Sequence, residues 1–418
     1  MTTNIYVFED NGFKGLLPLV YSRGVFELRC GIGSLLEKIV RAYPQAKPLL
    51  FCRDYLIDVI GERLPYSVIK KGSKGGDGLF INGRLLMSEP IALSGPEEIG
   101  VQGEALVYVR LKKDKAASLT SEDFLGGGIP AKLKGKVKIK KVKATLIDYP
   151  WDLVNHNGKQ IKDDFKFLVK KPQINGQLYE GVYLIDKAGI FIASGVIIKP
   201  GTVLDAEKGP IYIDRGAEIF PNVTIEGPVF IGRGTKIKAG AKIYSATSIG
   251  EVCKVGGEVE NSIIHSYSNK QHDGFLGHAY LGMWVNLGAD TNNSDLKNNY
   301  SQVQVNLSGE RMVNTNTTLA GVFVADHAKS AIGTMFNTGT VVGFASNVFY
   351  RGFAPKFIPS FAWGQGKETV TYIPAKAAAT ARIVMSRRGL KMSAAQEKLF
   401  KTIFELTSSA RKNAGILK

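Results

Sequence analysis

Three of the chain's five histidines, His265, His272 and His278, fall in one short segment. A histidine can remove a proton near neutral pH, and the attack of an amine on a thioester needs such a base. The tetrahedral oxyanion that forms would need backbone N–H donors, which glycine-rich turns could supply. The segment therefore predicts a site for acyl transfer. The alternative for any one of these histidines is a structural role, in which it caps a turn.

The residues before this segment repeat with a period of six, and this repeat predicts the scaffold that must hold the histidines. Six residues turn an α-helix through about 600 degrees, so apolar residues at this spacing would scatter around a helix. Short strands that form the three sides of a triangular coil place one such residue inward per side, which is the signature of hexapeptide repeats in a left-handed parallel β-helix. The series comprises Ile213, Ile219, Ile225, Ile231, Ile237, Ile243, Ile249 and Val255.

The same period extends in both directions. An earlier series is offset by a three-residue insertion around Glu207–Pro210, and a later series continues the stack to about residue 350. Between the two we expect an irregular excursion over residues 265–300, which contains the three histidines. Loops on a rigid scaffold are where function tends to lie. The flanking series are Ile192, Ile198 and Leu204, then Leu281 and Leu287, then Val324, Ser330, Phe336, Val342 and Val348.

Both flanks of the repeat have other patterns. Residues 1–150 alternate apolar strand-like stretches with helical segments, which predicts an α/β domain. After Pro374 the chain becomes rich in Ala and Arg and is predicted to be helical, with a second helix from Ser393. We therefore expect an α/β domain with its connector over 1–180, a β-helix over 181–374 and short C-terminal helices over 375–418.

Composition limits the remaining function classes. The net charge of +17 favours anionic ligands in general. The densest basic run, Lys132–Lys143, alternates lysines with apolar residues, which is typical of an edge strand; a strand facing an anion site is the alternative. Nucleic-acid binding and a membrane span are not expected. Three scattered cysteines and the absence of a visible secretion signal predict a cytoplasmic protein.

At this point the sequence resembles a known family. The stretch FLGHAYLGMWVNLGADT (275–291) is similar to the acetyltransferase half of bifunctional sugar-1-phosphate nucleotidyltransferase/acetyltransferases, which make UDP-N-acetylglucosamine. The residues after it resemble the archaeal and Bacteroidetes-type branch, and YPWDLVNHNGKQIKDDF (149–165) resembles the connector between the two halves. The resemblance implies acetyl-CoA as co-substrate and a homotrimer with active sites between adjacent β-helices.

The resemblance also implies roles for individual residues. His278 would be the general base, with His272 as its rival, and Tyr280 would lie in the amino-sugar pocket. Asp295 stands where relatives often have Asn, so it would put an extra carboxylate near the acceptor amine. Candidate phosphate ligands are Lys270 and Lys297, and candidate acetyl-CoA-facing residues are Gly288, Ala289 and Thr291.

A different role for the histidines comes from the γ-class carbonic anhydrases, whose β-helix histidines bind Zn²⁺. That role needs ligands that converge on one point. The neighbouring motif matches the acyltransferases better, and the identity of any metal is left open.

The N-terminal segment LLPLVYSRGVFELRCGIGSLLEKI (16–39) resembles the phosphate-binding loop of the same branch, with Gly24 in place of a common Pro. Arg23, Arg29 and Lys38 are then the phosphate-binding candidates. The usual GxGTR signature is absent. The alternative is a surface loop whose arginines pair with acidic neighbours.

A second departure concerns the metal. Where the family has an Asp that holds catalytic Mg²⁺, this chain reads LFINGRLL, with Arg84 at the matching position. An arginine cannot ligate Mg²⁺. Asp10, Asp77 or Asp152 could supply the ligand if this domain is active.

The sequence thus predicts an acetyl-CoA-dependent N-acetyltransferase that acts on an amino-sugar 1-phosphate, coupled to a sugar-1-phosphate nucleotidyltransferase. Two alternatives stay open. One is a nucleotidyltransferase alone, with the β-helix serving only to trimerise the chain. The other is a non-catalytic regulator that binds sugar nucleotides.

Overall fold

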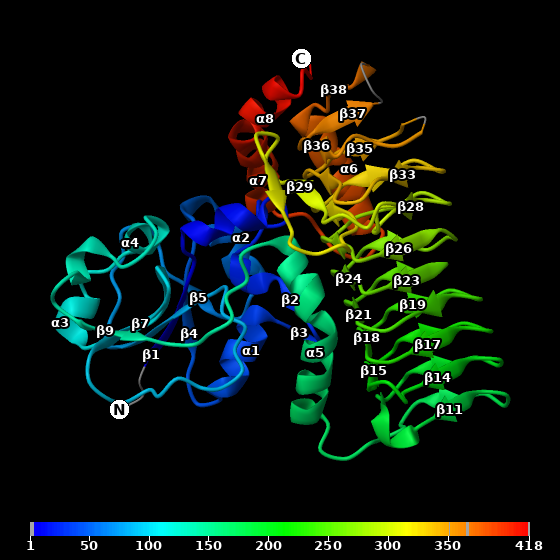
Figure 1. The fold of residues 1–418 in the computed structure, drawn as a ribbon, viewed down its shortest axis with the longest axis horizontal. Helices are drawn as coiled ribbons and strands as arrows, with labels where there is room; N and C mark the ends of the chain where they lie inside the picture. The colour runs from blue at the N-terminus through cyan, green and yellow to red at the C-terminus, as the bar shows by residue number, and fades with distance from the viewer. Residues whose placement is uncertain (1–3, 351, 365–367, 417–418) are drawn as a thin grey trace. The chain divides into compact units, whose positions relative to one another are not determined.

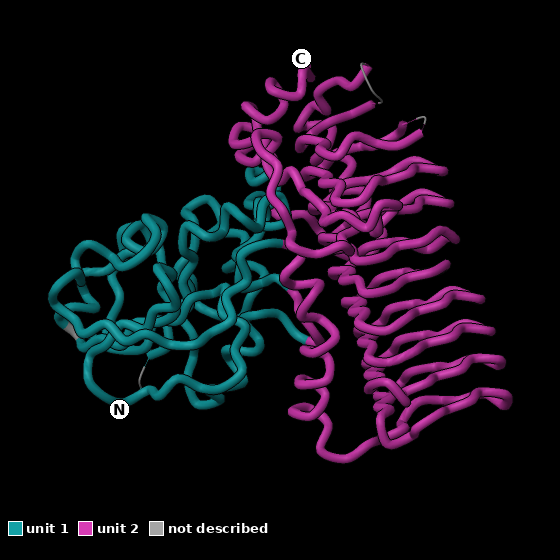
Figure 2. Tube along the Cα trace, viewed as in Figure 1, with its two compact units in different colours: residues 1–28, 33–149, 394–399 teal, residues 29–32, 150–393, 400–418 magenta. Residues whose placement is uncertain are grey.

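The computed structural model describes residues 4–350, 352–364 and 368–416, so the ends of the first and last predicted domains lie outside the described residues. The chain packs as two compact units that draw on separate stretches of sequence (Figure 2). Unit 1 comprises Met1–Leu28, Gly33–Tyr149 and Ala394–Leu399. Unit 2 comprises Arg29–Ile32, Pro150–Ser393 and Phe400–Lys418. The predicted domains are continuous stretches divided at residues 180 and 374, whereas each compact unit combines stretches that are far apart in the sequence.

Unit 1 contains a seven-stranded mixed sheet in the order β5-β4-β1-β6-β8-β7-β9. The strands β5, β4, β1 and β6 run parallel, while β8 is antiparallel to both β6 and β7. Stacked rings fill one face, with Tyr6 and Phe80 at 4.3 Å and Phe8 and Phe124 at 4.2 Å between ring centroids. The predicted α/β domain is confirmed. Its elements are β1 (Asn4–Phe8), α1 (Leu35–Ala42), β4 (Pro48–Phe51), α2 (Ile57–Arg63), β5 (Ser67–Val68), β6 (Gly78–Asn82), β7 (Glu98–Gln102), β8 (Ala105–Leu111), α3 (Lys113–Ala116), α4 (Ser121–Leu125) and β9 (Lys138–Lys141).

The basic run lies at the edge of this sheet, as its alternation predicts. Only Lys138–Lys141 form a strand, β9, and all four residues are exposed. The run's beginning forms a 3₁₀ helix, Ala131–Leu133, in place of the predicted strand. Lysines on an edge strand discourage pairing with another chain.

Unit 2 is a left-handed parallel β-helix whose coils have three sides (Figure 1). We call these sides the first, second and third faces. The first face is one nine-stranded sheet: β12 (Ile190–Ile192), β15 (Ile211–Ile213), β18 (Val229–Ile231), β21 (Thr247–Ile249), β24 (Ile263–Ile264), β27 (Tyr280–Leu281), β31 (Phe323–Val324), β34 (Val341–Val342) and β36 (Phe357–Ile358).

The other two faces are each divided between two sheets. The second face contains β10 (Gln177–Leu178), β13 (Ile197–Ile198), β16 (Glu218–Ile219), β19 (Lys236–Ile237), β22 (Lys254–Val255) and β25 (Asn269–Lys270), then β32 (Lys329–Ser330), β35 (Asn347–Val348), β37 (Ala362–Gly364) and the antiparallel β38 (Val370–Thr371). The third face contains β11 (Tyr183–Ile185), β14 (Val203–Asp205), β17 (Thr224–Glu226), β20 (Lys242–Ile243), β23 (Glu258–Glu260) and β26 (Phe275–Gly277), then β28 (Asn292–Asn293) and β33 (Met335–Phe336).

The predicted inward column is confirmed residue by residue. All eight members from Ile213 to Val255 are 0% exposed and belong to one core. Successive members lie on successive faces, so that Ile213, Ile231 and Ile249 pair in register along the first face. The stack extends to Ile358 and Ala362.

The predicted excursion is placed wrongly. Residues 265–294 still form coils, and the break runs from Asp295 to Ala320, where a hairpin pairs β29 (Gln304–Asn306) with β30 (Met312–Asn314). The period of six is lost there because one coil is shorter: Ile249 pairs with Ile264 and Val255 with Lys270, each 15 residues apart, whereas Ile231 and Ile249 pair 18 residues apart. Two inward positions are also polar, since Lys270 continues the column after Val255 and Asn293 pairs with Phe336.

Helices flank the β-helix in the sequence, and all of their residues except Ala394–Leu399 belong to unit 2. α5 (Pro150–Leu168) packs on the first face, where Trp151 meets Phe323 and Ile161 and Phe165 meet Phe230. The predicted C-terminal helices are confirmed as α6 (Pro374–Ser386), α7 (Ala394–Leu406) and α8 (Ser408–Asn413). Ile416, just after α8, packs against the end of the core, as a stack of repeats requires of a cap. No helix in the described ranges has both the length and the apolar character needed to cross a bilayer.

The column makes a quantitative prediction. The substitution Ile237→Ala should lower the free energy of unfolding by roughly 2–5 kcal/mol, because it removes buried methylenes and leaves a cavity. The neighbouring outward residue gives a matched control: Lys236→Ala should cost less than about 1 kcal/mol, since Lys236 forms only an exposed ion pair with Glu218. Denaturant unfolding of both variants measures the difference. Equal costs would contradict the inward assignment.

Candidate active site

The three histidines have different hydrogen-bond partners in the structure. His278 lies between β26 and β27, and its Nδ1 is 2.7 Å from Oδ2 of Asp295. His272 is exposed in the turn after β25, with its Nε2 3.2 Å from Nε2 of Gln271. His265 is buried, and its Nδ1 accepts a hydrogen bond from the backbone N–H of Ser266 at 2.9 Å. His278 thus makes a short hydrogen bond to a carboxylate.

The contact between His278 and Asp295 favours one tautomer of a neutral imidazole. An ionised Asp295 can only accept, so in that tautomer Nδ1 of His278 carries the proton and Nε2 the lone pair. In the described parts of the chain, Nε2 has no hydrogen-bond partner of its own. The two side chains are 14% and 16% exposed, so the pair is partly shielded but can be reached from solvent. This is the arrangement of a general base with an orienting carboxylate.

The backbone around His278 is held from several sides. His278 has a φ of +45°, which is uncommon for a residue with a side chain. The side-chain amide of Asn293 accepts from the N–H of Gly277 and donates to its carbonyl, both at 2.9 Å. The carbonyl of His278 accepts from the N–H of Gly321. The inward amide of Asn293, which interrupts the apolar column, therefore fixes the turn that carries His278.

Gly277 is also required by the carboxylate. A Cβ at this position would lie 2.3 Å from Oδ2 of Asp295, the oxygen that bonds His278. Asp295 itself is anchored where the coil ends, since its carbonyl accepts from the N–H of Ala320 at 2.9 Å. The pair therefore depends on close contact between one coil and the start of the next.

The other predicted acetyl-transfer residues lie nearby in the coils. Tyr280 is 0% exposed, and its hydroxyl accepts from the backbone N–H of Arg29 at 3.0 Å, so it lies beneath the surface. In the predicted acetyl-CoA-facing turn, Oγ1 of Thr291 donates to the carbonyl of Gly288 at 2.8 Å. The carbonyl of Ala289 accepts from the N–H of Gly333 in the next coil.

The two lysines proposed as phosphate ligands differ in accessibility. Lys270 points into the β-helix, where its Nζ donates to the carbonyl of His272 at 2.7 Å, and burial lowers its pKa to about 8. It would have to leave the interior to meet a phosphate. Lys297 is half-buried in the loop after Asp295, and its Nζ donates to the carbonyl of Gln302 at 2.7 Å.

Arg29, predicted as a phosphate ligand of the N-terminal domain, belongs to unit 2 instead. Its guanidinium forms an ion pair with Glu251 at 2.8 Å and lies 5.2 Å from the ring centre of Phe230. The positive charge of Arg29 lowers the pKa of Glu251 to about 2. Sequence reasoning missed this pair because its members are 222 residues apart.

The rest of the segment Arg29–Ile32 is fixed by α5. The N–H of Gly31 donates to Asn157 at 2.7 Å, and the N–H of Ile32 donates to Asp164 at 2.9 Å. The carbonyl of Gly31 accepts from the hydroxyl of Ser248 at 2.8 Å. The segment therefore completes the wall of the β-helix unit behind Tyr280.

In unit 1, the other two predicted phosphate ligands are enclosed. Arg23 is 1% exposed and Lys38, on α1, is 0% exposed. The loop is organised by a different ion pair: Arg53 binds Glu9 through two nitrogens and also donates to the carbonyl of Arg23 at 2.8 Å. A phosphate could reach these cations only if the loop opened.

The residues of unit 1 do not fit the Mg²⁺ that the family resemblance implies. Asp10 lies next to Arg84, but both of its oxygens bind the Arg84 guanidinium at 2.7 Å. Asp77 is exposed and Asp152 begins α5 in unit 2. Within the described residues, no three His, Cys, Asp or Glu side chains gather as metal ligands, in either unit. This finding also gives no support to a zinc site at the three histidines.

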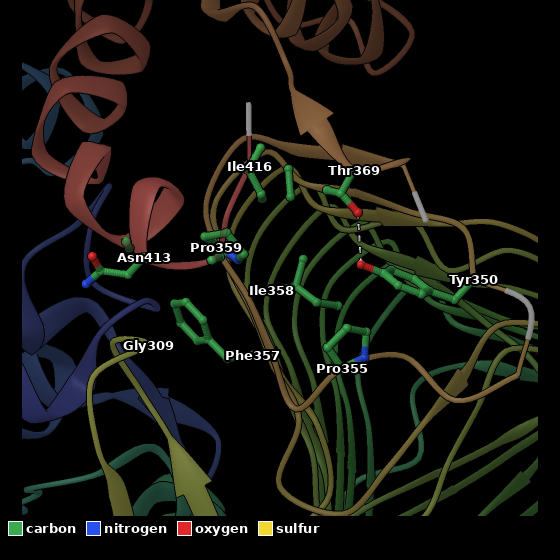
Figure 3. A pocket seen from close by; sticks show the side chains of 12 residues that line it. Gly309, Tyr350, Pro355, Phe357, Ile358, Pro359, Thr369, Asn413 and Ile416 are labelled. Carbon is green, nitrogen blue, oxygen red and sulfur yellow. Dashed lines mark hydrogen bonds between the residues drawn. The ribbon is translucent and has the colours of Figure 1, made fainter. Parts of the chain in front are cut away.

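A cavity of about 280 Å³ lies at the end of the β-helix, not at His278 (Figure 3). Phe357, Ile358 and Pro359 line it, and the hydroxyls of Tyr350 and Thr369 meet at its rim at 3.2 Å. Its position beside α8 and Ile416 is that of an incompletely filled cap.

The chain is similar in sequence to known sugar-phosphate enzymes. Residues 5–173 match the sugar nucleotidyl transferase family. A bifunctional sugar-1-phosphate nucleotidylyltransferase/acetyltransferase of Sulfurisphaera tokodaii is 33% identical over 144 residues, which is 34% of this chain and 36% of that protein. The bifunctional protein GlmU of Synechococcus elongatus is 29% identical over 152 residues, or 32% of this chain and 33% of that protein. The resemblance predicted from the sequence is confirmed.

These matches have a limited extent. The chain aligns with about a third of the length of each of these relatives. Among solved structures, a Francisella novicida UDP-N-acetylglucosamine acyltransferase aligns over 58% of this chain and 87% of its own, with 14% identity and a TM-score of 0.33. That score is too low to add to the fold assignment, which depends on the paired strands of unit 2.

The ion pair between Arg29 and Glu251 predicts a pH dependence of stability. Because the pKa of Glu251 is lowered from 4.5 to about 2, its contribution to stability is complete above about pH 4.5 and is lost as the pH falls toward 2. At neutral pH it amounts to at most about 3 kcal/mol. The variant Glu251→Gln should therefore be less stable than the wild type at pH 7, and the difference should vanish near pH 2.

Denaturant unfolding at several pH values measures this difference. Glu218→Gln is the control, because its partner Lys236 is on the surface and the pair contributes little. A difference between wild type and Glu251→Gln that stays constant from pH 7 to pH 2 would contradict the assignment.

Proposed function

We propose that unit 2 transfers an acetyl group from acetyl-CoA to the amine of an amino-sugar 1-phosphate, with His278 as general base. The hydrogen bond between His278 and Asp295 is the observation that carries the proposal. The similarity to sugar-1-phosphate nucleotidylyltransferase/acetyltransferases supports the choice of substrates. UDP-N-acetylglucosamine synthesis for the cell envelope is the pathway that this reaction would serve.

The proposed chemistry follows from the proton arrangement. The amine nitrogen attacks the thioester carbonyl, and Nε2 of His278 takes the proton that the nitrogen loses. Asp295 stabilises the imidazolium that forms and keeps the ring in its reactive tautomer. When the tetrahedral intermediate collapses, the C–S bond breaks and the thiolate of CoA receives the proton from His278. The products are the N-acetyl sugar phosphate and free CoA.

Other residues would bind the two substrates. Gly288, Ala289 and Thr291 form the turn proposed to face acetyl-CoA, and Lys297 is the more accessible candidate for the sugar phosphate. Tyr280 would support the pocket from below, through its hydrogen bond to Arg29. A cytoplasmic location is proposed because acetyl-CoA and sugar phosphates are present there, and the three buried free cysteines are compatible with a reducing compartment.

A homotrimer is also proposed, and the charges of two faces support it. The outward side of the second face carries Lys236, Lys238 and Lys254, and burial together with nearby cations lowers the pKa of Lys254. On the third face Glu226, Glu258 and Glu260 surround Tyr244, whose pKa is raised by burial and by these carboxylates. Unlike charges on different faces favour head-to-tail contacts, which close into a ring.

For unit 1, the match of residues 5–173 supports binding of a sugar nucleotide or its phosphates. This is the observation that favours the second candidate, in which the chain acts on nucleotides and the β-helix serves assembly. Transfer of a nucleotidyl group by unit 1 is the weaker part of that candidate, because the expected metal ligand is replaced by Arg84.

The base assignment can be tested directly. His278→Ala should lower the rate of thiol release from acetyl-CoA with glucosamine 1-phosphate by roughly 10²–10⁴, since one general base is removed. Asp295→Asn should lower it as well, because an amide can donate to Nδ1 and so favour the wrong tautomer. The matched control is His272→Ala, which should keep the wild-type rate. Thiol release followed with a chromogenic disulfide measures all three.

Two results would count against the proposal. If His278→Ala keeps the wild-type rate, the imidazole is not the base. If the wild-type chain releases no thiol with any amino-sugar 1-phosphate, acetyl transfer to this substrate class is wrong.

The assembly has its own measurement. Light scattering of the purified chain should give about three times the mass of one chain, and the charge reversal Lys254→Glu should reduce it because like charges would then face each other. Lys391→Glu, at an exposed position after α6, is the control. A wild-type mass of one chain would contradict the trimer.

A further inference from the structure

The carboxyl ends of parallel strands in unit 1 meet where a ligand is expected. β1 has β4 on one side and β6 on the other, so the chain's strand order reverses at β1. In open α/β sheets, ligands bind at such a point. Asp10 follows β1 and Arg84 follows β6, and the two side chains meet there.

The surroundings of the Arg84 guanidinium consist of oxygen atoms. Nε and Nη2 donate to the two oxygens of Asp10, each at 2.7 Å. Nη1 donates to the carbonyl of Ile147 at 3.1 Å and to a carboxylate oxygen of Asp148. Carboxylate and carbonyl oxygens are the ligands that Mg²⁺ and Ca²⁺ prefer. The guanidinium therefore occupies a set of donors that suits a hard cation.

Asp10 has no oxygen lone pair to spare for a metal. Besides Arg84, its Oδ1 accepts from the N–H of Gly12 at 3.0 Å and its Oδ2 accepts from the side chain of Asn82 at 2.8 Å. Each oxygen thus accepts two hydrogen bonds, which is the usual capacity of a carboxylate oxygen. A divalent ion could bind Asp10 only by displacing these partners.

The backbone is shaped to admit the arginine. A Cβ at Gly12 would lie 2.2 Å from Cζ of Arg84, so only glycine leaves room for the guanidinium. The backbone N–H of Arg84 donates to the side-chain oxygen of Asn82 at 2.9 Å, which fixes where the side chain begins. Arg84 is therefore built into this position and is not a surface residue folded over it.

We propose that Arg84 is a tethered cation that stands in the place of a divalent metal, so that unit 1 takes up no metal there and does not perform metal-dependent nucleotidyl transfer. A guanidinium supplies one permanent charge and directed N–H groups, but it cannot act as a Lewis acid on a phosphate oxygen. Unit 1 is then a domain for binding nucleotides or sugar nucleotides. This inference does not rest on acetyl transfer by unit 2.

Manganese as a spectroscopic substitute for magnesium tests the proposal on the full chain. Titration of Mn²⁺ followed by electron paramagnetic resonance should show no bound ion in the wild type. Arg84→Ala should gain one bound Mn²⁺ per chain, because it frees the oxygens of Asp10 and Asp148. The double variant Arg84→Ala/Asp10→Asn should lose that ion again. Arg110→Ala is the matched control: it removes another enclosed arginine but frees one carboxylate, that of Glu98, and should bind none.

A second measurement uses the wild type and does not depend on how well Arg84→Ala folds. The midpoint of thermal unfolding should be the same with and without Mg²⁺, since an ion that binds only the folded state would raise it. Pyrophosphate release from UTP or dTTP with a sugar 1-phosphate and Mg²⁺ should stay at background. Two metal-binding results would overturn the proposal: the wild type binds one Mn²⁺ and Asp10→Asn abolishes this binding, or folded Arg84→Ala binds no Mn²⁺. It is also overturned if Mg²⁺ raises the unfolding midpoint of the wild type but not that of Asp10→Asn. Mg²⁺-dependent release of pyrophosphate would overturn it as well.

Discussion

The burial of one aliphatic side chain per side of each coil is the constraint on which the rest of unit 2 depends. A single coil cannot shield its inward residues from water, so each coil is stable only when it is stacked between two other coils. Stacking leaves the turns between strands in fixed register, because a shift of one residue would turn the aliphatic side chains outward. A residue at a turn, such as His278, therefore has a position set by many buried contacts that it does not make itself.

The column is interrupted by polar residues close to the candidate base. Asn293 takes an inward position and uses its amide to hold both backbone groups of Gly277. Lys270, on β25 of the second face, takes another and donates from its ammonium to a backbone carbonyl. Such residues cost stability, because each replaces an apolar side chain in a dry interior. Polar residues that lower the stability of the β-helix are thus found close to His278, as expected near a functional site.

Sequence reasoning succeeded where the signal is local and periodic. The spacing of Ile213 to Val255 is sufficient to predict the β-helix, because no other regular structure buries every sixth residue. The same reasoning places the excursion wrongly, because the coil after Val255 is shorter than eighteen residues and Lys270 and Asn293 put polar side chains at inward positions. The sequence shows Asp295 as a departure from related proteins, but its contact with His278 depends on how two coils stack, which the sequence does not show.

Pairs between distant segments were beyond such reasoning altogether. The sequence shows that Arg84 cannot hold a metal, yet it does not show that the guanidinium is bound by Asp10. The position of Arg29 in the chain predicts a phosphate loop, whereas its charge is matched by Glu251 in the β-helix. These contacts join residues whose separation in sequence carries no periodic signal, and only the folded chain brings them together.

The four residues Arg29–Ile32 have a practical consequence for dividing the protein. A fragment that began at Pro150 would contain every coil, yet Asn157, Asp164 and Ser248, each 0% exposed in the intact chain, would lose their hydrogen bonds to Gly31 and Ile32. A hydrogen bond of this kind contributes about 0.5–1.5 kcal/mol to stability. The β-helix therefore cannot be separated by cutting the chain before Pro150 without loss of stability, because the upstream segment Arg29–Ile32 is one of its structural parts.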